Sequence, residues 1–402
     1  MPLPLEGIKI IEWGVLLQAP YAASLLGEWG AEIIKIEPLV GEMVRGYHTF
    51  GGVSQELKGG RNLGFEHNNP SKRGIALNLK TEQARQVVYK LVDKADVFMH
   101  NQLEETAIEL GMDYETLSRY NPKLIYSVAN GLGLKGPDKD GPSYDTMALA
   151  RAGNMMAVGE PGTPPQVALG AQADIMGATL LAYGTCLALI ARDRFGIGQK
   201  VDGSLFGGAM HLLSYALLTA HLVGKEIPRQ DRRKVVNPLY NHYICADGKW
   251  IIIGGLQIDR FWPNFCKIVG IEALRDDPRF QNWQGDPDKT EEIVRILDEK
   301  FATKPREEWM SLLKSIRMAY APVQTVSEVL TDPQALENEY IVPIDHPVLG
   351  RILTSKCPVH LSKTPARNKS AAPELGEHTE EVLLELGYDW DEILKLKEEN
   401  AI

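Results

Sequence analysis

Short apolar runs alternate with amphipathic stretches over the first 130 residues. Residues 19–29 and 81–95 carry apolar side chains at helical spacing, and Gly30 marks the end of the first stretch. Apolar runs of strand length lie at residues 8–13, 31–37, 75–79, 95–99 and 124–128. Strands that alternate with helices indicate βαβ units, so we expect an α/β fold with a mostly parallel sheet.

The pattern changes near residue 225. A charged connection at residues 225–234 leads into the alternation of a β-hairpin at 240–253, with Asp247-Gly248 at its turn. Helical patterns follow at residues 260–269, 290–302 and 306–316, and a final amphipathic helix opens at 376–387. This change from alternating strands and helices to a hairpin followed by helices predicts a second, smaller α+β domain over residues 225–327.

Two long uncharged runs, at residues 175–191 and 204–224, have nearly the length of a membrane span. Glycines, hydroxyl side chains and two histidines in the second run argue against a span. We interpret both runs as core helices of a large α/β protein. The N-terminus lacks the basic and apolar segments of a secretory signal, so we expect a cytoplasmic protein without a membrane partner.

Composition and missing motifs disfavour several classes of function. The 402 residues carry 53 acidic and 43 basic side chains, a net charge of −10, which disfavours a nucleic-acid partner. The four cysteines lie without CxxC spacing or a histidine cluster, so we expect no metal site. The chain lacks the glycine fingerprint of dinucleotide binding, the P-loop motif and the G-x-S-x-G elbow. Nicotinamide oxidoreductases, P-loop NTPases and serine hydrolases of that type are therefore disfavoured.

Asp174 is the first candidate for chemistry. It directly precedes the apolar run from Ile175, where the N-terminus of a helix offers unpaired N–H groups and partial positive charge. A carboxylate in this place either caps the helix or reacts with a ligand. Small residues in the following turn, from Gly177 to Thr179, would let another molecule approach closely. The sequence alone leaves both roles open.

Seven segments, taken in order, resemble the class III CoA-transferase family, which includes formyl-CoA and carnitine CoA-transferases. They lie at residues 30–45, 69–80, 121–126, 131–133, 136–137, 144–145 and 375–379. Asp174 falls where the family keeps its catalytic aspartate. The resemblance implies a Rossmann-like large domain built from both chain ends, residues 1–224 and 328–402, with the small α+β domain inserted between them. It also implies two interlocked subunits.

The resemblance further implies an activity. CoA would move from an acyl-CoA donor to a small carboxylic acid through an acyl–aspartyl anhydride and an aspartyl-CoA thioester on Asp174. CoA thus enters as a co-substrate, and no metal takes part. The aromatic residues Tyr240, Trp250 and Trp262 favour a larger apolar or aromatic acid as acceptor. Benzylsuccinate-type, carnitine-type and 2-hydroxy acids all remain candidates.

Family positions that contact CoA carry over onto a defined set of residues. The implied contacts are Leu17, Gln18, Leu77, Asn78, Leu79, Lys80, Asn101, Tyr144 and Asp145. Basic residues of the formyl-CoA branch are replaced here by Pro38, Glu109 and Pro142. Other cations must then meet the CoA phosphates, and the candidates are Arg45, Lys72, Arg73 and Lys135. In the small domain, Gly254 and Gly255 are candidate oxyanion donors, and Tyr240 and His242 are candidates for the acyl pocket.

Two alternatives stay open beside a homodimeric transferase. The 2-methylacyl-CoA racemases share the fold, but they place a basic histidine at the position of Tyr144, and a tyrosine is a poor base at neutral pH. The second alternative is a heterodimer with a paralogous subunit. Because this chain keeps Asp174, it would be the active subunit of such a pair.

Overall fold

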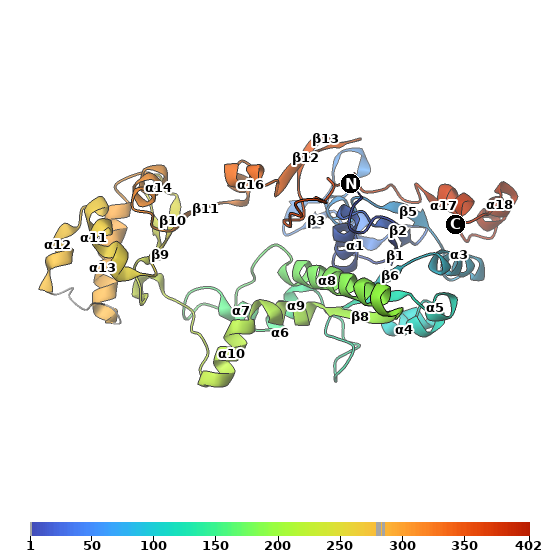
Figure 1. The fold of residues 1–402 in the computed structure, drawn as a ribbon, viewed down its shortest axis with the longest axis horizontal. Helices are drawn as coiled ribbons and strands as arrows, with labels where there is room; N and C mark the ends of the chain where they lie inside the picture. The colour runs from blue at the N-terminus through green and yellow to red at the C-terminus, as the bar shows by residue number, and fades with distance from the viewer. Residues whose placement is uncertain (1, 279–282, 284–285) are drawn as a thin grey trace. The chain divides into compact units, whose positions relative to one another are not determined.

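The computed structural model describes residues 2–278, 283 and 286–402. Within these residues the chain forms two compact units (Figure 1). The large unit comprises Met1–Met155, Val167–Gly224 and Leu336–Ile402, and the small unit comprises Met156–Gln166 and Lys225–Ala335. Each unit has a hydrophobic core of its own.

A parallel sheet organises the large unit. Its strands lie in the order β5 (Arg73–Ala76), β2 (Glu32–Glu37), β1 (Lys9–Trp13), β6 (Val97–His100), β7 (Ile125–Asn130) and β8 (Gln199–Ser204). All neighbouring pairs in this sheet are parallel, which confirms the expected parallel α/β fold. The order is that of a doubly wound Rossmann sheet, and the chain switches direction between β1 and β6.

Helices cover both faces of this sheet, because neighbouring residues along each strand point to opposite sides. Ile10 belongs to the cluster formed with α1 (Gln18–Glu28) and α8 (Gln172–Phe195). Ile11 belongs to the cluster that contains α3 (Glu82–Asp93), α17 (Thr379–Glu385) and α18 (Trp390–Glu398). The C-terminal helices therefore complete the core of a sheet made by the first half of the chain.

One strand differs from its predicted bounds. The apolar run at residues 75–79 predicted a strand, but β5 spans Arg73–Ala76 and the chain turns after it. Asn78 explains the turn, because its backbone N–H bonds to the carbonyl of Ala401 at 2.9 Å and not to the sheet. Leu77 and Leu79 still enter the core from this turn. The predicted final helix corresponds to α17, and α18, capped by Asp389, follows it.

The two uncharged runs differ in burial. In the described part of the chain, α8 is the one helix long and apolar enough to span a membrane, and it packs against α1, β7 and β8 as a core helix. The second run forms the end of β8, then α9 (Leu205–Leu212) and α10 (Ser214–Val223), which are bent by 68°. The expectation of a core helix is wrong for α10, since none of its residues is buried within the single chain.

The small unit contains an antiparallel sheet in the order β11 (Tyr320–Val323), β10 (Trp250–Gly254) and β9 (Tyr240–Ile244). The predicted hairpin is confirmed, with Trp250 opposite Ile244 and Gly248 at φ 73° in the turn. The predicted helices are also confirmed as α11 (Ile258–Val269), α13 (Pro287–Phe301) and α14 (Arg306–Ser315).

Short elements connect these parts. In the large unit they are β3 (Thr49–Phe50), β4 (Val53–Ser54), α2 (Leu63–Asn68), α4 (Glu104–Glu109), α5 (Tyr114–Tyr120), α6 (Asp145–Arg151), β12 (Ile341–His346) and β13 (Gly350–Ser355). The helix α7 (Asn154–Ala157) lies where the chain passes from the large unit to the small unit. The remaining short helices are η1 (Met43–Gly46), η2 (Lys58–Gly60), η3 (Arg232–Lys234), α12 (Glu272–Asp276), α15 (Val326–Val329) and α16 (Pro333–Glu337).

Candidate active site

A pocket of about 550 Å³ opens in the large unit where β1, β6 and β7 end. Its walls come from the loops that follow these strands, including residues 15–18, 100–104 and 129–131. The pocket also reaches along β7 and β8 to Tyr126 and Lys200, which are partners in the sheet. Open α/β sheets bind ligands at the carboxyl ends of the strands, beside the switch point. This pocket is therefore the candidate active site.

Asp174 lies in the wall of this pocket, in the first turn of α8. Of its two predicted roles, capping belongs to another residue. One carboxylate oxygen of Asp145 accepts hydrogen bonds from the N–H groups of Ala173, at 2.7 Å, and Asp174, at 3.2 Å. Asp145 thus occupies the N-terminus of α8 from the start of α6. The carboxylate of Asp174 is left for chemistry in the pocket.

Burial raises the pKa of Asp174 to about 7, and the nearby carboxylate of Asp145 contributes to the rise. Both causes act against the ionised form, the first by desolvation and the second by repulsion. Asp174 is therefore partly ionised near neutral pH. Perturbed carboxyl groups of this kind in a pocket are typical of active sites.

Gln18, the first residue of α1, packs against the start of α8, where Asp174 lies. The side chain of Gln18 is buried, and its Nε2 donates a hydrogen bond to the carbonyl of Gly203 at 3.1 Å. It also packs against Gly177, three residues after Asp174, where an added Cβ would lie 2.7 Å from Nε2. Glycine at position 177 is therefore required for this approach.

Several predicted CoA contacts line the same pocket. Leu17, Gln18, Asn101 and Tyr144 all lie in its wall together with Asp174. Asn101, directly after β6, accepts a hydrogen bond from the N–H of Val15 at 2.9 Å and donates one to its carbonyl at 2.7 Å. The structure thus brings together predicted residues from four separate segments of the sequence.

Three predicted phosphate ligands do not line this pocket and are bonded to other groups of the protein. Arg45 makes a two-pronged ion pair with Glu37, with both distances 2.8 Å. Arg73 pairs with three carboxylates, those of Glu32, Glu381 and Glu385. Lys72 is buried and bonded to four oxygen atoms, and burial lowers its pKa to about 8 although Glu12 opposes the fall.

The predicted contact stretch at residues 77–80 also lies outside the pocket wall. Leu77 and Leu79 are buried in the core, and the side chain of Asn78 donates a hydrogen bond to the carbonyl of Asn400 at 3.0 Å. Lys80 and Lys135 are exposed, and neither lines the pocket. The structure therefore does not bring these residues to Asp174.

Two lysines that sequence reasoning missed line the pocket. Lys139 lies in the loop before α6, and Lys200 lies on β8. The ammonium group of Lys200 lies 3.6 Å from the carboxylate of Glu104 and 5.8 Å from the centre of the Tyr126 ring. No other lysine or arginine among the described residues lines this pocket. Neither lysine lies in one of the seven segments that resemble the family, so no sequence signal pointed to them.

The candidate residues of the small unit lie on β9 and at the end of β10. The backbone N–H of Gly254 bonds to the carbonyl of Ala319 at 2.8 Å, and that of Gly255 bonds to Leu239 at 2.6 Å. Both N–H groups are thus already engaged within the small unit, and their role as oxyanion donors stays a prediction. Tyr240 and His242 are exposed on β9.

Metal chemistry has no candidate centre in the described part of the chain. No group of three or more His, Cys, Asp and Glu side chains among these residues is arranged to hold a metal ion.

Comparisons with known proteins match this chain to CoA-transferases. Residues 5–379 match the family model described as CoA-transferase family III. The (R)-2-hydroxy-4-methylpentanoate CoA-transferase of Clostridioides difficile is 32% identical, over 99% of this chain and 99% of that protein. The cinnamoyl-CoA:phenyllactate CoA-transferase of Clostridium sporogenes is 30% identical, over 99% of this chain and 97% of that protein. A CAIB/BAIF family protein from Brucella suis has a TM-score of 0.84 at 28% identity, over 96% of this chain and 100% of that chain.

Proposed function

The chain belongs to CoA-transferase family III, and from this premise we propose that it transfers CoA from an acyl-CoA to a 2-hydroxy acid with an apolar side chain. The observation that carries the proposal is Asp174, a half-buried carboxyl group of raised pKa in the wall of the switch-point pocket. Support for the acceptor comes from two relatives, whose names specify a branched and an aromatic 2-hydroxy acid.

The proposed reaction uses Asp174 as nucleophile. Its ionised carboxylate attacks the thioester carbonyl of the donor, and CoA leaves as thiolate from an acyl–aspartyl anhydride. The thiolate attacks the aspartyl carbonyl of this anhydride, which releases the donor acid and forms an aspartyl-CoA thioester. The acceptor carboxylate then repeats the two steps in reverse, so that acceptor-CoA leaves and Asp174 is restored. A fixed, desolvated carboxylate favours the attack, which is slow in water.

Each step passes through a tetrahedral oxyanion that needs a hydrogen-bond donor. The N–H groups of Ala173 and Asp174 are bonded to Asp145, and those of Gly254 and Gly255 are bonded within the small unit. We therefore assign the oxyanion to Gln18. Its amide has a second N–H beyond the one donated to Gly203, and it packs one helical turn from Asp174.

We propose that Lys200 and Lys139 bind the phosphates of CoA. Lys200 pairs with Tyr126, which lies four positions before Asn130 at the end of β7. That spacing corresponds to about 13 Å along the strand. The pantetheine arm of CoA separates its thiol from its phosphates by a comparable length. Because Asp174 and Lys200 both lie in the wall of this pocket, one extended ligand would reach from a thiol beside Asp174 to phosphates near Lys200.

We propose a homodimer as the assembly, with a large domain built from both chain ends. The support is the exposed apolar side of two helices in the single chain: Tyr183, Leu187 and Ile190 on α8, and Tyr215 and Leu222 on α10. Large exposed apolar patches mark interaction surfaces. Light scattering on the purified chain should give twice the monomer mass, whereas a stable monomer would favour a heterodimer with a paralogous subunit.

The direct test of the function is intact-protein mass spectrometry after mixing the protein with succinyl-CoA or acetyl-CoA. A CoA adduct that maps to Asp174 and is cleaved by hydroxylamine is the expected result. Transfer to 4-methyl-2-hydroxypentanoate or phenyllactate then identifies the acceptor class. Exchange of the α-proton of a 2-methylacyl-CoA with deuterium from solvent, without any adduct, would overturn the proposal in favour of a racemase.

The rate of adduct formation should depend on pH through Asp174. Because its pKa is raised to about 7, the nucleophilic form grows as pH rises through that value and then reaches a plateau. Asp145→Asn keeps an oxygen for the N–H groups of α8 but removes a charge that raises this pKa, so the midpoint should move to lower pH. Single-turnover rates from about pH 5 to about pH 9 measure both profiles. A flat wild-type profile would contradict the assignment.

A further inference from the structure

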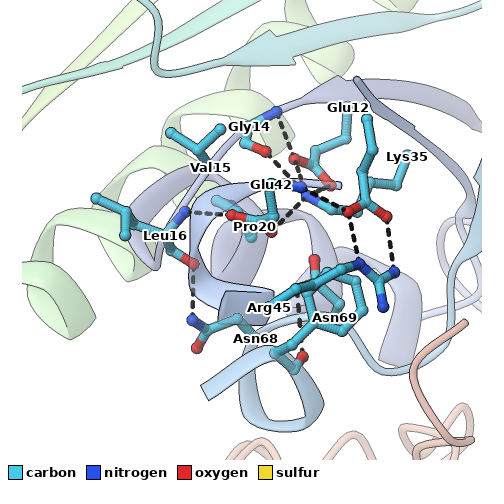
Figure 2. A network of polar contacts seen from close by, with 12 residues as sticks. Glu12, Gly14, Val15, Leu16, Pro20, Lys35, Glu42, Arg45, Asn68 and Asn69 are labelled. Carbon is cyan, nitrogen blue, oxygen red and sulfur yellow. Dashed lines mark hydrogen bonds and ion pairs between the residues drawn. The ribbon is translucent and has the colours of Figure 1, made fainter. Parts of the chain in front are cut away.

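Side chains hold the loop after β1 (Figure 2). Gly14, Val15 and Leu16 have six backbone N–H and C=O groups, and each is bonded to a side chain. The partners are Glu12 for the Gly14 N–H (2.6 Å), Lys35 for its carbonyl (2.8 Å), Asn101 for both groups of Val15 (2.9 and 2.7 Å), Glu42 for the Leu16 N–H (2.7 Å) and Asn68 for its carbonyl (2.7 Å). The conformation of this loop therefore depends on Glu12, two residues before it, and on four side chains far from it in the sequence.

Three of these partners form, with Lys72, a buried ionic cluster that we call the loop-holding cluster: Glu12, Lys35, Glu42 and Lys72. The four side chains have no exposed surface. Glu12 lies 3.3 Å from the ammonium group of Lys35 and 3.0 Å from that of Lys72, and Lys35 lies 3.0 Å from Glu42. Two carboxylates and two ammonium groups thus balance one another without solvent.

Lys72 ties this cluster to the neighbouring helices. Its ammonium group donates hydrogen bonds to the carbonyls of Pro20, at 2.7 Å, and Asn68, at 3.2 Å. Pro20 lies in the first turn of α1, and Asn68 is the last residue of α2. The cluster therefore fixes both ends of the loop, its origin on β1 and its continuation into α1.

The loop itself is strained. Leu16 has a φ of 62°, in the left-handed region that side-chain-bearing residues seldom adopt. Such residues persist where the surroundings over-determine them, and they concentrate at ligand-binding sites. Glu42 and Asn68 bind the two polar groups of Leu16, and Leu16 lies in the pocket wall. The cluster thus stabilises a strained wall of the pocket.

Stability alone is a poor reason for four buried charges. Desolvation of each ion is unfavourable, and apolar residues of similar volume in place of a buried ion pair are often as stable or more so. The charges bond to main-chain groups of one loop, which apolar side chains could not hold. Their arrangement is therefore suited to fixing a backbone conformation.

We propose that the loop-holding cluster positions the loop at residues 14–18 for acyl-CoA before the ligand arrives. This inference rests on the proposed function. Glu42 acts through Leu16 on the two residues that follow, Leu17 and Gln18, which line the pocket beside Asp174. Glu42 is then a positioning residue that touches neither CoA nor the reacting atoms. Preorganisation of this kind reduces the ordering that binding must otherwise impose.

Glu42→Gln tests the proposal, because glutamine keeps the length of the side chain but removes the charge beside Lys35. We expect kcat/KM for acyl-CoA to fall about tenfold or more in adduct formation. The amide hydrogens of residues 14–18 should exchange faster with deuterium, since the N–H of Leu16 loses a charged acceptor. Glu42→Asp retains the carboxylate and should recover most of the lost kcat/KM.

Glu28→Gln is the matched control. Glu28 is equally buried, bonds to Lys369 at 3.2 Å and to the N–H of Cys357 at 2.8 Å, and lies at the opposite end of α1 from the loop. Both Gln variants should lower the melting temperature, but Glu28→Gln should leave kcat/KM and the exchange of the loop unchanged.

The wild-type protein and the two Gln variants distinguish a failure of the proposed function from a failure of the positioning role. A wild-type protein that forms no adduct with acyl-CoA refutes the proposed function, and with it the role of the cluster toward CoA. A wild-type adduct combined with unchanged kcat/KM and unchanged exchange in Glu42→Gln refutes the positioning role alone. Equal losses in Glu42→Gln and Glu28→Gln would show that the cluster only stabilises the fold.

Discussion

Asp174→Asn is expected to lower CoA transfer at least about 10,000-fold and to form no CoA adduct. The substitution preserves shape but replaces a nucleophilic carboxylate by an amide. The fold should survive, because Asp145 caps α8 and the backbone N–H groups at its start keep that partner. Turnover and intact mass measure the effect. Asp193→Asn, an exposed change on the same helix, should behave as wild type, and an active Asp174→Asn protein would refute the nucleophile.

The same variant should be more stable than wild type above neutral pH. The folded state raises the pKa of Asp174 from 3.8 to about 7, so the folded protein binds this proton more tightly than the unfolded chain. This difference lowers the free energy of unfolding of the wild-type protein. The loss is absent below about pH 4, grows up to about pH 7 and is complete above it, with an upper limit of about 4 kcal/mol. Asp174→Asn removes it, so the gain in melting temperature should be larger at about pH 8 than at about pH 5.

Lys200→Glu is expected to raise KM for acyl-CoA between about 10-fold and 100-fold, with kcat changed less than about threefold. Reversing this charge removes one of two lysines from the pocket wall and places a second carboxylate beside Glu104. Phosphates of CoA would then meet repulsion, while the carboxylate of Asp174 itself would be unchanged. Steady-state kinetics with the acyl-CoA varied separate the two parameters.

The dependence of KM on salt and a second charge reversal distinguish a phosphate contact of Lys200 from an effect of net charge. Wild-type KM should rise with ionic strength, because salt screens exposed phosphate contacts, and Lys200→Glu should respond less. Lys123→Glu makes the same change at an exposed position before the start of β7 and outside the pocket wall, so its KM should equal that of wild type. A rise in KM of the same size in both variants would indicate an effect of net charge alone.

The sequence pattern predicted the large sheet well because its strands are buried on both faces. Apolar runs such as Ile10-Ile11 remain visible where both sides of a strand pack against helices. The pattern failed at Leu77 and Leu79, whose side chains are as buried as those of a strand although the backbone turns away. Burial determines the apolar pattern, and burial does not distinguish a strand from a turn that enters the core.

The candidate site was only partly predictable for a related reason. Asp174 was identified because its place before an apolar helix is a local signal. Asp145, which caps that helix, lies 29 residues away from Asp174, and no local pattern connects them. Lys72 looked available for phosphate because charged residues are usually exposed. Its burial against Glu12, 60 residues away, arises only when β1 and β5 are assembled in the sheet.

The position of α17 and α18 on the core has a consequence for biosynthesis. Val382, Leu383, Ile393 and Leu396 close the same cluster as Ile11 and Ile75, although the six strands are complete at Ser204. A ribosome therefore releases the whole sheet, and then the small unit, before α17 and α18, which cover part of one face beside α3, have been synthesised. That part of the apolar face must remain open during translation of about half the chain, so the nascent protein is expected to depend on chaperones until α17 and α18 emerge.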